Sequence, residues 1–332
     1  MTGGRGFVGA WLVRELLERG HRVVSLDRAA SRERPSGLAL LEIEREVIEV
    51  DGDLVDPHVA LRALADHRVD TVFHLAAQTL VGAAAALPGP TLEVNVRGTW
   101  SVLEACREHG VARVVVASSD KAYGTHEELP YREDFALRPT APYEASKAAA
   151  DLIARSYWHS HGLPVAVTRF VNVYGGGDTN FSRLIPEAVS AALDGRAPVL
   201  RSDGSPERDF LYVEDAARAY VVIAEGLDRD EVRGQAFNAG GGRPYRVRDV
   251  VELIARLAGS DVEPEIRGAG SPDGEIDRQY VDPSKIRELL GWKPRIDLEK
   301  GLRRTIEWYR EHPRVRAPAA PRRPTLRRCD SN

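Results

Sequence analysis

The chain has 332 residues and a mass of 36.5 kDa, enough for two lobes that bury a sizeable core. Its 46 basic and 50 acidic residues nearly balance, which argues against nucleic acid or an anionic membrane as the main partner. Two distant cysteines and nine histidines without zinc-binding spacing exclude a disulfide scaffold and give no reason to expect a metal. No apolar run approaches about 18 residues and no charged-then-apolar segment opens the chain, so we expect a cytoplasmic protein without a membrane span.

The chain opens with a glycine-rich turn that runs directly into a helical pattern. After it, short apolar segments alternate with longer amphipathic ones, which is typical of a doubly wound parallel sheet in an α/β protein. We expect strands at residues 23–27, 47–50, 71–75, 113–117 and 165–170, and helices at residues 57–66, 91–109, 142–161 and 181–194.

The opening turn follows the spacing GxxGxxG at Gly3, Gly6 and Gly9. Such glycines allow a tight strand-to-helix turn and close approach of the backbone to a pyrophosphate, which then faces the helix N-terminus. Asp27 ends the next predicted strand, where its carboxylate can bind ribose hydroxyls and repel a 2′-phosphate. We therefore predict NAD rather than NADP; the alternative is a glycine turn in an α/β protein that binds no nucleotide. The residues assigned to the cofactor here are Gly3, Gly6, Phe7, Val8, Asp27 and Arg28.

In a doubly wound fold this turn follows the first, central strand. Here only Met1 and Thr2 precede Gly3, so we expect a truncated first strand. Either the true start lies upstream, or the chain has been shortened, or the sheet has a gap at its centre; our hypothesis is a misassigned start. If the start is misassigned, extending the reading frame by about eight residues should raise the melting temperature and the bound NAD. No gain in either would contradict this interpretation.

Beyond residue 175 the alternation becomes irregular and rich in Gly and Pro, which indicates a smaller lobe that closes over a ligand. We expect a Rossmann lobe over residues 1–175 with a return segment over about 207–240, and a substrate-binding lobe over residues 176–206 and 241–312. Residues 313–332 are rich in Pro and Arg and too poor in apolar side chains to form a core, so we expect a disordered tail.

A second group of chemically capable residues lies in the middle of the chain. Tyr143 and Lys147 are four residues apart at the start of a predicted helix, hence on one face, where the ammonium, together with the positive nicotinamide, favours the phenolate. Ser119, Asp120 and Lys121 directly follow the predicted strand at 113–117, at the strand end where ligands bind in this fold. The spacing predicts that these side chains share one site.

With these motifs in place, the chain resembles the extended short-chain dehydrogenase/reductase family, specifically its nucleotide-sugar epimerases and dehydratases. The resemblance implies bound NAD, a sugar-nucleotide substrate, and a homodimer formed through a helix pair that includes residues 142–161. It also places Asp53 and Leu54 beside the adenine, and Leu75, Ala76 and Ala77 along the cofactor cleft. The matching segments, in family order, are residues 2–9, 52–54, 74–78, 95–99, 118–124, 143–147, 168–175, 208–215 and 282–292.

The same resemblance implies roles for individual side chains. Ser119 hydrogen-bonds the reacting sugar hydroxyl, Tyr143 is the base, and Lys147 also holds the nicotinamide ribose. The residues implied to contact the substrate are Gln78, Thr79, Ser119, Asn172, Arg208 and Arg278.

Asp120 and Lys121 indicate which reaction is catalysed. An acid beside the serine is what water elimination needs: oxidation at C4 acidifies the C5 proton, a base removes it, an acid protonates the leaving C6 hydroxyl, and the hydride returns to C6. The Asp-Lys pair is most similar to CDP-glucose 4,6-dehydratases, although it also resembles C5-inverting UDP-GlcNAc dehydratases. We therefore expect an NDP-hexose 4,6-dehydratase, with CDP-glucose as the first candidate substrate and GDP-mannose or another NDP-hexose as the second.

The role of Lys121 stays open, and so do two alternative functions. Lys121 serves either as the C5 base, if its pKa is lowered, or as an electrostatic partner of Asp120 or of a developing enolate; a solvated surface lysine is the third reading. A 4-epimerase needs Ser119, Tyr143 and Lys147 but leaves Asp120 and Lys121 without a task. A non-catalytic nucleotide sensor has no need of the complete Ser-Tyr-Lys set.

Overall fold

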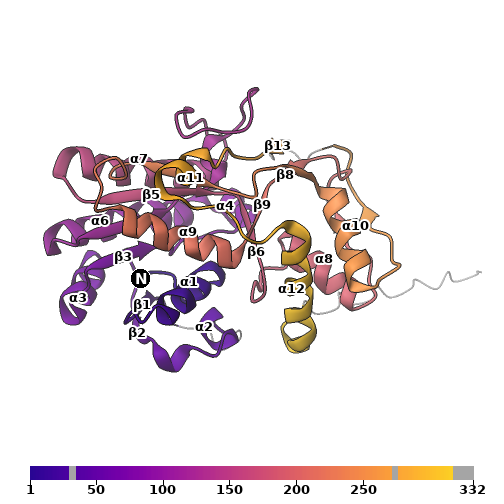
Figure 1. Cartoon of the computed structure of the whole chain (residues 1–332), viewed down its shortest axis with the longest axis horizontal. Coiled ribbons are helices and arrows are strands. Elements are labelled where there is room, and N and C mark those ends of the chain that lie inside the picture. Colours follow the sequence, from indigo (N-terminus) through magenta and orange to yellow (C-terminus); the bar gives the residue numbers. More distant parts are fainter. Residues whose placement is uncertain (30–34, 271–275, 317–332) are drawn as a thin grey trace, which may run out of the picture.

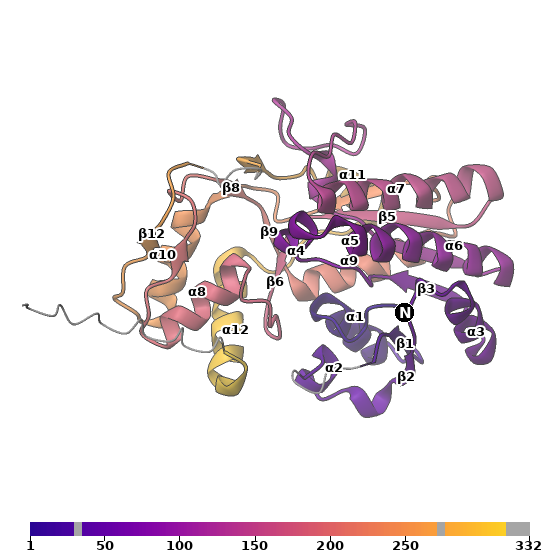
Figure 2. The same ribbon diagram turned by 180° about the vertical axis from the view of Figure 1, so that it is seen from behind.

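The computed structural model describes residues 1–29, 35–270 and 276–316. Two lobes lie side by side along the longest axis (Figure 1): a larger α/β lobe that contains the N-terminus, and a smaller one built around α8, α10 and α12. The opposite view shows the same division (Figure 2). No helix among the described residues is long and apolar enough to cross a membrane.

The larger lobe is built on parallel strands, as the alternating pattern predicts. β1 pairs with β2, and β10, β5, β4 and β3 pair in that order, all in parallel. The strands are β1 (Val24–Asp27), β2 (Ile48–Asp51), β3 (Thr71–His74), β4 (Arg113–Ala117), β5 (Val165–Phe170) and β10 (Ala236–Ala239).

The first two residues lie between β1 and β3. Thr2 forms isolated parallel bridges to Leu26 on one side and to His74 on the other. The Met1 ammonium donates a 2.7 Å hydrogen bond to the Val24 carbonyl, and Thr2 donates from its backbone to Phe73. This two-residue segment therefore joins the two groups of strands at the position of the central strand.

Helices cover both faces of this sheet. Alternate strand residues face opposite ways, so Val115 and Ala166 contribute to the core under α1 and α9, whereas Val114 and Val165 contribute to the core under α3 and α6. α6 packs against α3 and α7, and α1 packs against α9. The helices of this lobe are α1 (Phe7–Glu18), α2 (Gly37–Leu40), α3 (Pro57–His67), α4 (Val81–Ala86), α5 (Pro88–Leu92), α6 (Gly98–His109), α7 (Pro142–His161), α9 (Val213–Gly226) and α11 (Ser284–Leu290).

The smaller lobe has its own apolar core, made by the buried faces of three helices and the residues around them. The parallel pair β6–β9 begins where β5 ends. Its elements are β6 (Asn172–Tyr174), α8 (Leu184–Leu193), β7 (Val199–Leu200), β8 (Glu207–Arg208), β9 (Phe210–Tyr212), β11 (Tyr245–Arg246), α10 (Val247–Ala258), β12 (Glu265–Ile266), β13 (Arg278–Gln279) and α12 (Leu298–Glu311).

The two lobes are more interleaved than the expected boundaries suggest. Ile286 of α11 and the nearby Trp292 are buried in the core of the larger lobe, although they fall within the expected substrate segment 241–312. Trp11 of α1 donates a 2.8 Å hydrogen bond from Nε1 to the Gly176 carbonyl, and a Cβ added at Gly176 would lie 2.3 Å from the Trp308 ring. Side chains from both ends of the chain therefore meet at the crossing into the smaller lobe.

The start of the expected tail is structured. Residues Pro313–Val315 form a 3₁₀ turn, and Arg316 donates to the Tyr309 carbonyl and pairs with Asp194 at 2.8 Å. The prediction of disorder is wrong for these residues because Arg316 finds partners on α12 and after α8. Residues 317–332 lie outside the described part of the chain.

Candidate active site

A cleft of about 1580 Å³ runs along the ends of the parallel strands and continues between the lobes. It is lined by nearly all residues that the sequence assigned to cofactor, substrate or chemistry. Those that line it are Gly3, Gly6, Phe7, Val8, Asp27, Arg28, Asp53, Leu54, Leu75, Ala76, Ala77, Thr79, Ser119, Asp120, Lys121, Tyr143, Lys147, Asn172 and Arg208.

The glycine turn at one end of the cleft leaves no room for a side chain at Gly3 or Gly9. A Cβ at Gly3 would lie 2.6 Å from the Ala76 backbone nitrogen, and one at Gly9 would lie 2.0 Å from the Gly3 carbonyl oxygen. Gly3 also adopts a φ of +78°, which favours glycine. The turn leads into α1 at Phe7, so it presents bare backbone and a helix N-terminus to the cleft, which fits a dinucleotide pyrophosphate.

Asp27 lies at the end of β1, near this turn, as its position in the sequence predicts. Its Oδ2 accepts hydrogen bonds from Ser25 Oγ at 2.6 Å and from the Arg5 backbone at 3.3 Å. Burial raises the pKa of Asp27, while these two donors and the nearby Arg5 charge oppose the rise. The carboxylate is thus fixed at the edge of the cleft, where it fits ribose hydroxyls.

Ser119 and Asp120 follow β4 and begin a 3₁₀ turn, Asp120–Tyr123. Ser119 caps the turn by accepting from the Lys121 backbone at 3.2 Å, and its Oγ donates to Asp120 Oδ1 at 3.0 Å. Asp120 is only 3% exposed, and its Oδ2 has no hydrogen-bond partner. A buried carboxylate oxygen without a partner is costly, and here it belongs to a residue that lines the cleft.

The protonation of Asp120 follows from this setting. Burial raises its pKa to about 6, against the opposing effects of the Lys121 charge, the Ser119 hydrogen bond and the Arg208 charge. An acid with this pKa holds its proton in about one molecule in ten at pH 7, against fewer than one in a thousand at the ordinary value of 3.8, and can donate it. Lys121 is half-buried and lines the same cleft.

Tyr143 and Lys147 lie in the first turns of α7, which begins at Pro142. Lys147 Nζ donates a 2.7 Å hydrogen bond to the Ala117 carbonyl at the end of β4, and burial lowers its pKa to about 8. Burial raises the pKa of Tyr143 to about 12, opposed by the Arg183 charge and by a hydrogen bond with Ser119 and increased by the Asp120 charge. The expected lowering by Lys147 is therefore not found, because burial of the phenol dominates.

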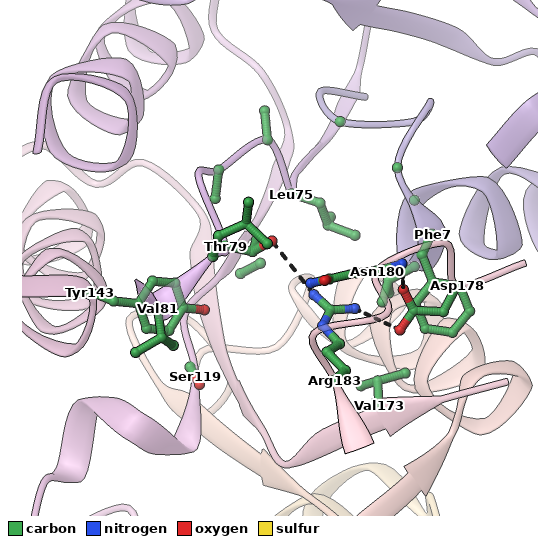
Figure 3. A pocket seen from close by; sticks show the side chains of 18 of the residues that line it. Phe7, Leu75, Thr79, Val81, Ser119, Tyr143, Val173, Asp178, Asn180 and Arg183 are labelled. Carbon is green, nitrogen blue, oxygen red and sulfur yellow. Dashed lines mark hydrogen bonds and ion pairs between the residues drawn. The ribbon is translucent and has the colours of Figure 1, made fainter. Parts of the chain in front are cut away.

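Sequence reasoning missed a cluster of three residues from the smaller lobe, Asp178, Asn180 and Arg183, which also line the cleft. Arg183, just before α8, pairs through Nη1 with Asp178 Oδ2 at 2.9 Å and reaches Thr79 Oγ1 at 3.5 Å through Nη2 (Figure 3). Asp178 also accepts from the Asn180 backbone at 3.0 Å. Arg183 thus links the two sides of the cleft near Tyr143. The sequence signal that could have indicated this cluster is a turn from Asp178 to Asn180, followed by Arg183 at the start of α8.

Two assigned substrate residues do not line the cleft. Gln78 uses its side-chain amide to bond the Leu80 carbonyl at 3.1 Å and Thr91 Oγ1 at 3.2 Å, so it shapes its own loop. Arg278 is 52% exposed and pairs with Glu207 at 2.8 Å, whereas the next residue, Gln279, is fully buried. Both assignments came from motif position, which does not determine which way a side chain points.

Comparison with known proteins decides the family. The profile of the family described as GDP-mannose 4,6 dehydratase matches residues 1–305. The chain belongs to this family. It is 35% identical over 338 residues to dTDP-glucose 4,6-dehydratase 1 of Escherichia coli (strain K12), covering 93% of this chain and 91% of that protein. The expected kinship with extended short-chain dehydrogenase/reductase enzymes of nucleotide-sugar chemistry is confirmed, and the chain is an enzyme of this kind.

Solved structures of enzymes with two different activities are similar to this chain. UDP-glucose 4-epimerase of Thermotoga maritima, with UDP-glucose, superposes with a TM-score of 0.85 at 28% identity, covering 94% of this chain and 98% of that chain. The dTDP-glucose 4,6-dehydratase of Streptomyces venezuelae, with NAD bound, gives 0.82 at 32% identity, covering 95% and 97%. The Rossmann architecture is confirmed, and overall shape does not distinguish the two reactions.

Proposed function

We propose that this chain is an NAD-dependent sugar-nucleotide 4,6-dehydratase, which removes water from an NDP-hexose to give the NDP-4-keto-6-deoxyhexose. The observation that carries the proposal is Asp120. It is a buried acid with a pKa of about 6 and an unpartnered oxygen, next to the serine of the Ser-Tyr-Lys set. Hydride transfer alone does not require such an acid, whereas loss of a hydroxyl group does.

The dinucleotide end of the cleft supports the cofactor assignment. The backbone of the glycine turn would hold the pyrophosphate, Asp27 the adenosine ribose, and Lys147 the nicotinamide ribose. When bound, NAD supplies a hydride acceptor for C4 of the sugar and later a hydride donor for C6, so the reaction has no net redox change.

Tyr143 takes the C4 hydroxyl proton during oxidation, while Ser119 holds that hydroxyl in place. Tyr143 must ionise to act, and its pKa of about 12 without a bound ligand shows how strongly burial disfavours the phenolate. The Arg183 guanidinium is the protein charge that opposes this effect most strongly, and the positive nicotinamide of the oxidised cofactor would act in the same direction.

Asp120 then protonates the C6 hydroxyl, which leaves as water, while a base removes the C5 proton. The same base returns a proton to C5 when C6 is reduced. Lys121 is one candidate for this base, and its other role is to stabilise charge on Asp120 or on the enolate that forms at C4–C5. Lys121→Ala distinguishes the two roles. Loss of C5 proton exchange with solvent is expected if Lys121 is the base, whereas retained exchange would assign it the electrostatic role.

The second candidate function is a 4-epimerase. The high similarity to a UDP-glucose 4-epimerase structure favours it, and the Ser-Tyr-Lys set serves both reactions. Asp120→Asn separates them. The variant is expected to lose water elimination while still binding NAD and oxidising C4, whereas unimpaired turnover to a C4 isomer would support the epimerase.

For the substrate we propose CDP-glucose first, from the Asp-Lys pair, and dTDP-glucose as the strongest rival, since the relatives at 34–35% identity are named for dTDP-glucose. The test is mass spectrometry after incubation with NAD and CDP-glucose, dTDP-glucose, GDP-mannose, UDP-glucose or UDP-GlcNAc. Loss of one water from a single substrate supports the dehydratase and identifies the nucleotide that it carries. Unchanged mass with a new C4 isomer would contradict it.

We also propose a homodimer formed through α6 and α7. These helices pack against each other, and each exposes a large apolar side chain, Trp100 on α6 and Leu152 on α7. Sedimentation should give a dimer for the wild-type chain and a monomer for Leu152→Glu. A wild-type monomer at micromolar concentration would contradict this arrangement.

A further inference from the structure

The glycine turn carries one charged side chain, Arg5, at the mouth of the cofactor cleft. Its guanidinium is held on three sides: Nε donates to Glu49 Oε2 at 2.5 Å, and Nη1 donates to Asp51 Oδ1 at 2.6 Å and to the Arg28 carbonyl at 2.8 Å. The Arg5 side chain is only 15% exposed. Arg5 lines the cleft, yet its Nε and Nη1 are both bound to protein oxygens.

The two carboxylates come from one edge of the sheet. Glu49 and Asp51 are two residues apart on β2, so they point to the same face of the strand. Asp51 is paired in register with Asp27 on β1. Asp27 in turn accepts a hydrogen bond from the Arg5 backbone. The acid that faces the ribose and the clamped guanidinium therefore share one corner of the cleft.

This corner contains both elements that discriminate between the two dinucleotides. An acid at the end of the second strand of the Rossmann unit favours NAD, whereas an arginine near the ribose accommodates the 2′-phosphate of NADP. A guanidinium is a strong phosphate ligand through charge-assisted hydrogen bonds. Here Nε and Nη1 are engaged by Glu49, Asp51 and the Arg28 carbonyl, which turn Arg5 toward β2.

Resting on the proposed NAD-dependent function, we propose that Glu49 and Asp51 are specificity-determining residues that hold Arg5 away from an incoming 2′-phosphate. Asp27 repels that phosphate, and the clamp withholds the one cation of the glycine turn that is placed to receive it. Turning Nε or Nη1 of Arg5 toward a 2′-phosphate would break its charge-assisted hydrogen bond to Glu49 or Asp51, whereas NAD, with a 2′-hydroxyl, leaves the clamp intact.

The test is equilibrium binding of NAD and of NADP to the full-length, cofactor-stripped protein by isothermal titration calorimetry. In E49Q/D51N the amides keep the side-chain shape but release the ion pairs. We expect NADP affinity to rise about tenfold or more while NAD affinity changes less than about threefold. In R5A/E49Q/D51N the gain in NADP affinity should disappear, because the released cation is then missing.

Controls separate this proposal from other effects. E42Q/E46Q removes two exposed acids of the same segment that form no ion pair with Arg5, and it should leave NADP affinity unchanged. Unchanged NADP affinity in E49Q/D51N, with a wild-type melting temperature, would overturn the clamp, and so would a gain that persists without Arg5. If the wild-type chain binds neither dinucleotide, the proposed function fails instead.

Discussion

Asp120 offers a test in which catalysis and stability are expected to change in opposite directions. The pKa of this acid is about 6 in the folded protein against an ordinary value of 3.8, because it is buried. Each pH unit between the two values corresponds to about 1.4 kcal/mol, so the ionised side chain costs folding about 3 kcal/mol. The raised value means that stability is present below pH 3.8 and is lost as the pH rises through about 6.

Asp120→Asn should therefore stabilise the protein at neutral pH. The amide keeps the oxygen that accepts from Ser119 and changes only the unpartnered Oδ2. Integrating the titration gives a gain of about 3 kcal/mol at pH 7.5 and about 1 kcal/mol at pH 4.5. The difference of about 2 kcal/mol between the two pH values does not depend on any uncharged packing cost.

The assay is urea unfolding of wild type and variant at pH 4.5 and pH 7.5, followed by tryptophan fluorescence. Asp66→Asn is the matched control, because Asp66 is exposed on α3 and its replacement should change the free energy of unfolding by less than about 0.5 kcal/mol at both pH values. An Asp120→Asn effect of the same size at both pH values would refute the reasoning, because it would show that no raised pKa underlies it.

Three further predictions follow from other contacts. Arg183→Gln removes a charge that lowers the pKa of Tyr143, so the acidic limb of kcat/KM against pH should move to higher pH; an unmoved limb would exclude this influence. Asp151→Asn leaves the buried Arg169 guanidinium without the carboxylate that it contacts at 2.7 Å, which should cost about 3–5 kcal/mol in urea unfolding. Gly9→Ala places a Cβ 2.0 Å from the Gly3 carbonyl oxygen in the glycine turn, so calorimetry should detect no NAD binding to the folded variant.

The local sequence pattern predicted the bounds of those strands and helices whose apolar residues are buried in or against the sheet. The predicted strands 113–117 and 165–170 and the helix 142–161 match β4, β5 and α7 in their bounds, because apolar runs and a proline start fix them. Since parallel strands bring their carboxyl ends to one edge, Ser119, Asp120 and Tyr143 could be placed together from strand and helix positions alone.

What sequence pattern could not give is side-chain direction and long-range pairing. Arg278 and Gln279 are neighbours on a two-residue strand, and only the fold decides that the arginine points outward to Glu207. Arg183 crosses the cleft to Thr79, a contact between residues 104 positions apart that no local motif encodes. The pKa of Tyr143 depends on burial, which is a property of the assembled site.

The crossing into the smaller lobe has a consequence for protein engineering. Recombining enzymes of this family by exchanging everything after residue 175 would separate Trp11 from Gly176, which share a hydrogen bond, although Gly176 and the Trp308 ring that it packs against would stay together. A chimaera joined only at chain position 175 would inherit mismatched partners from two parents. Transplanting both tryptophans together with the Gly176 loop should restore a compatible junction, so the practical unit of exchange is discontinuous in sequence.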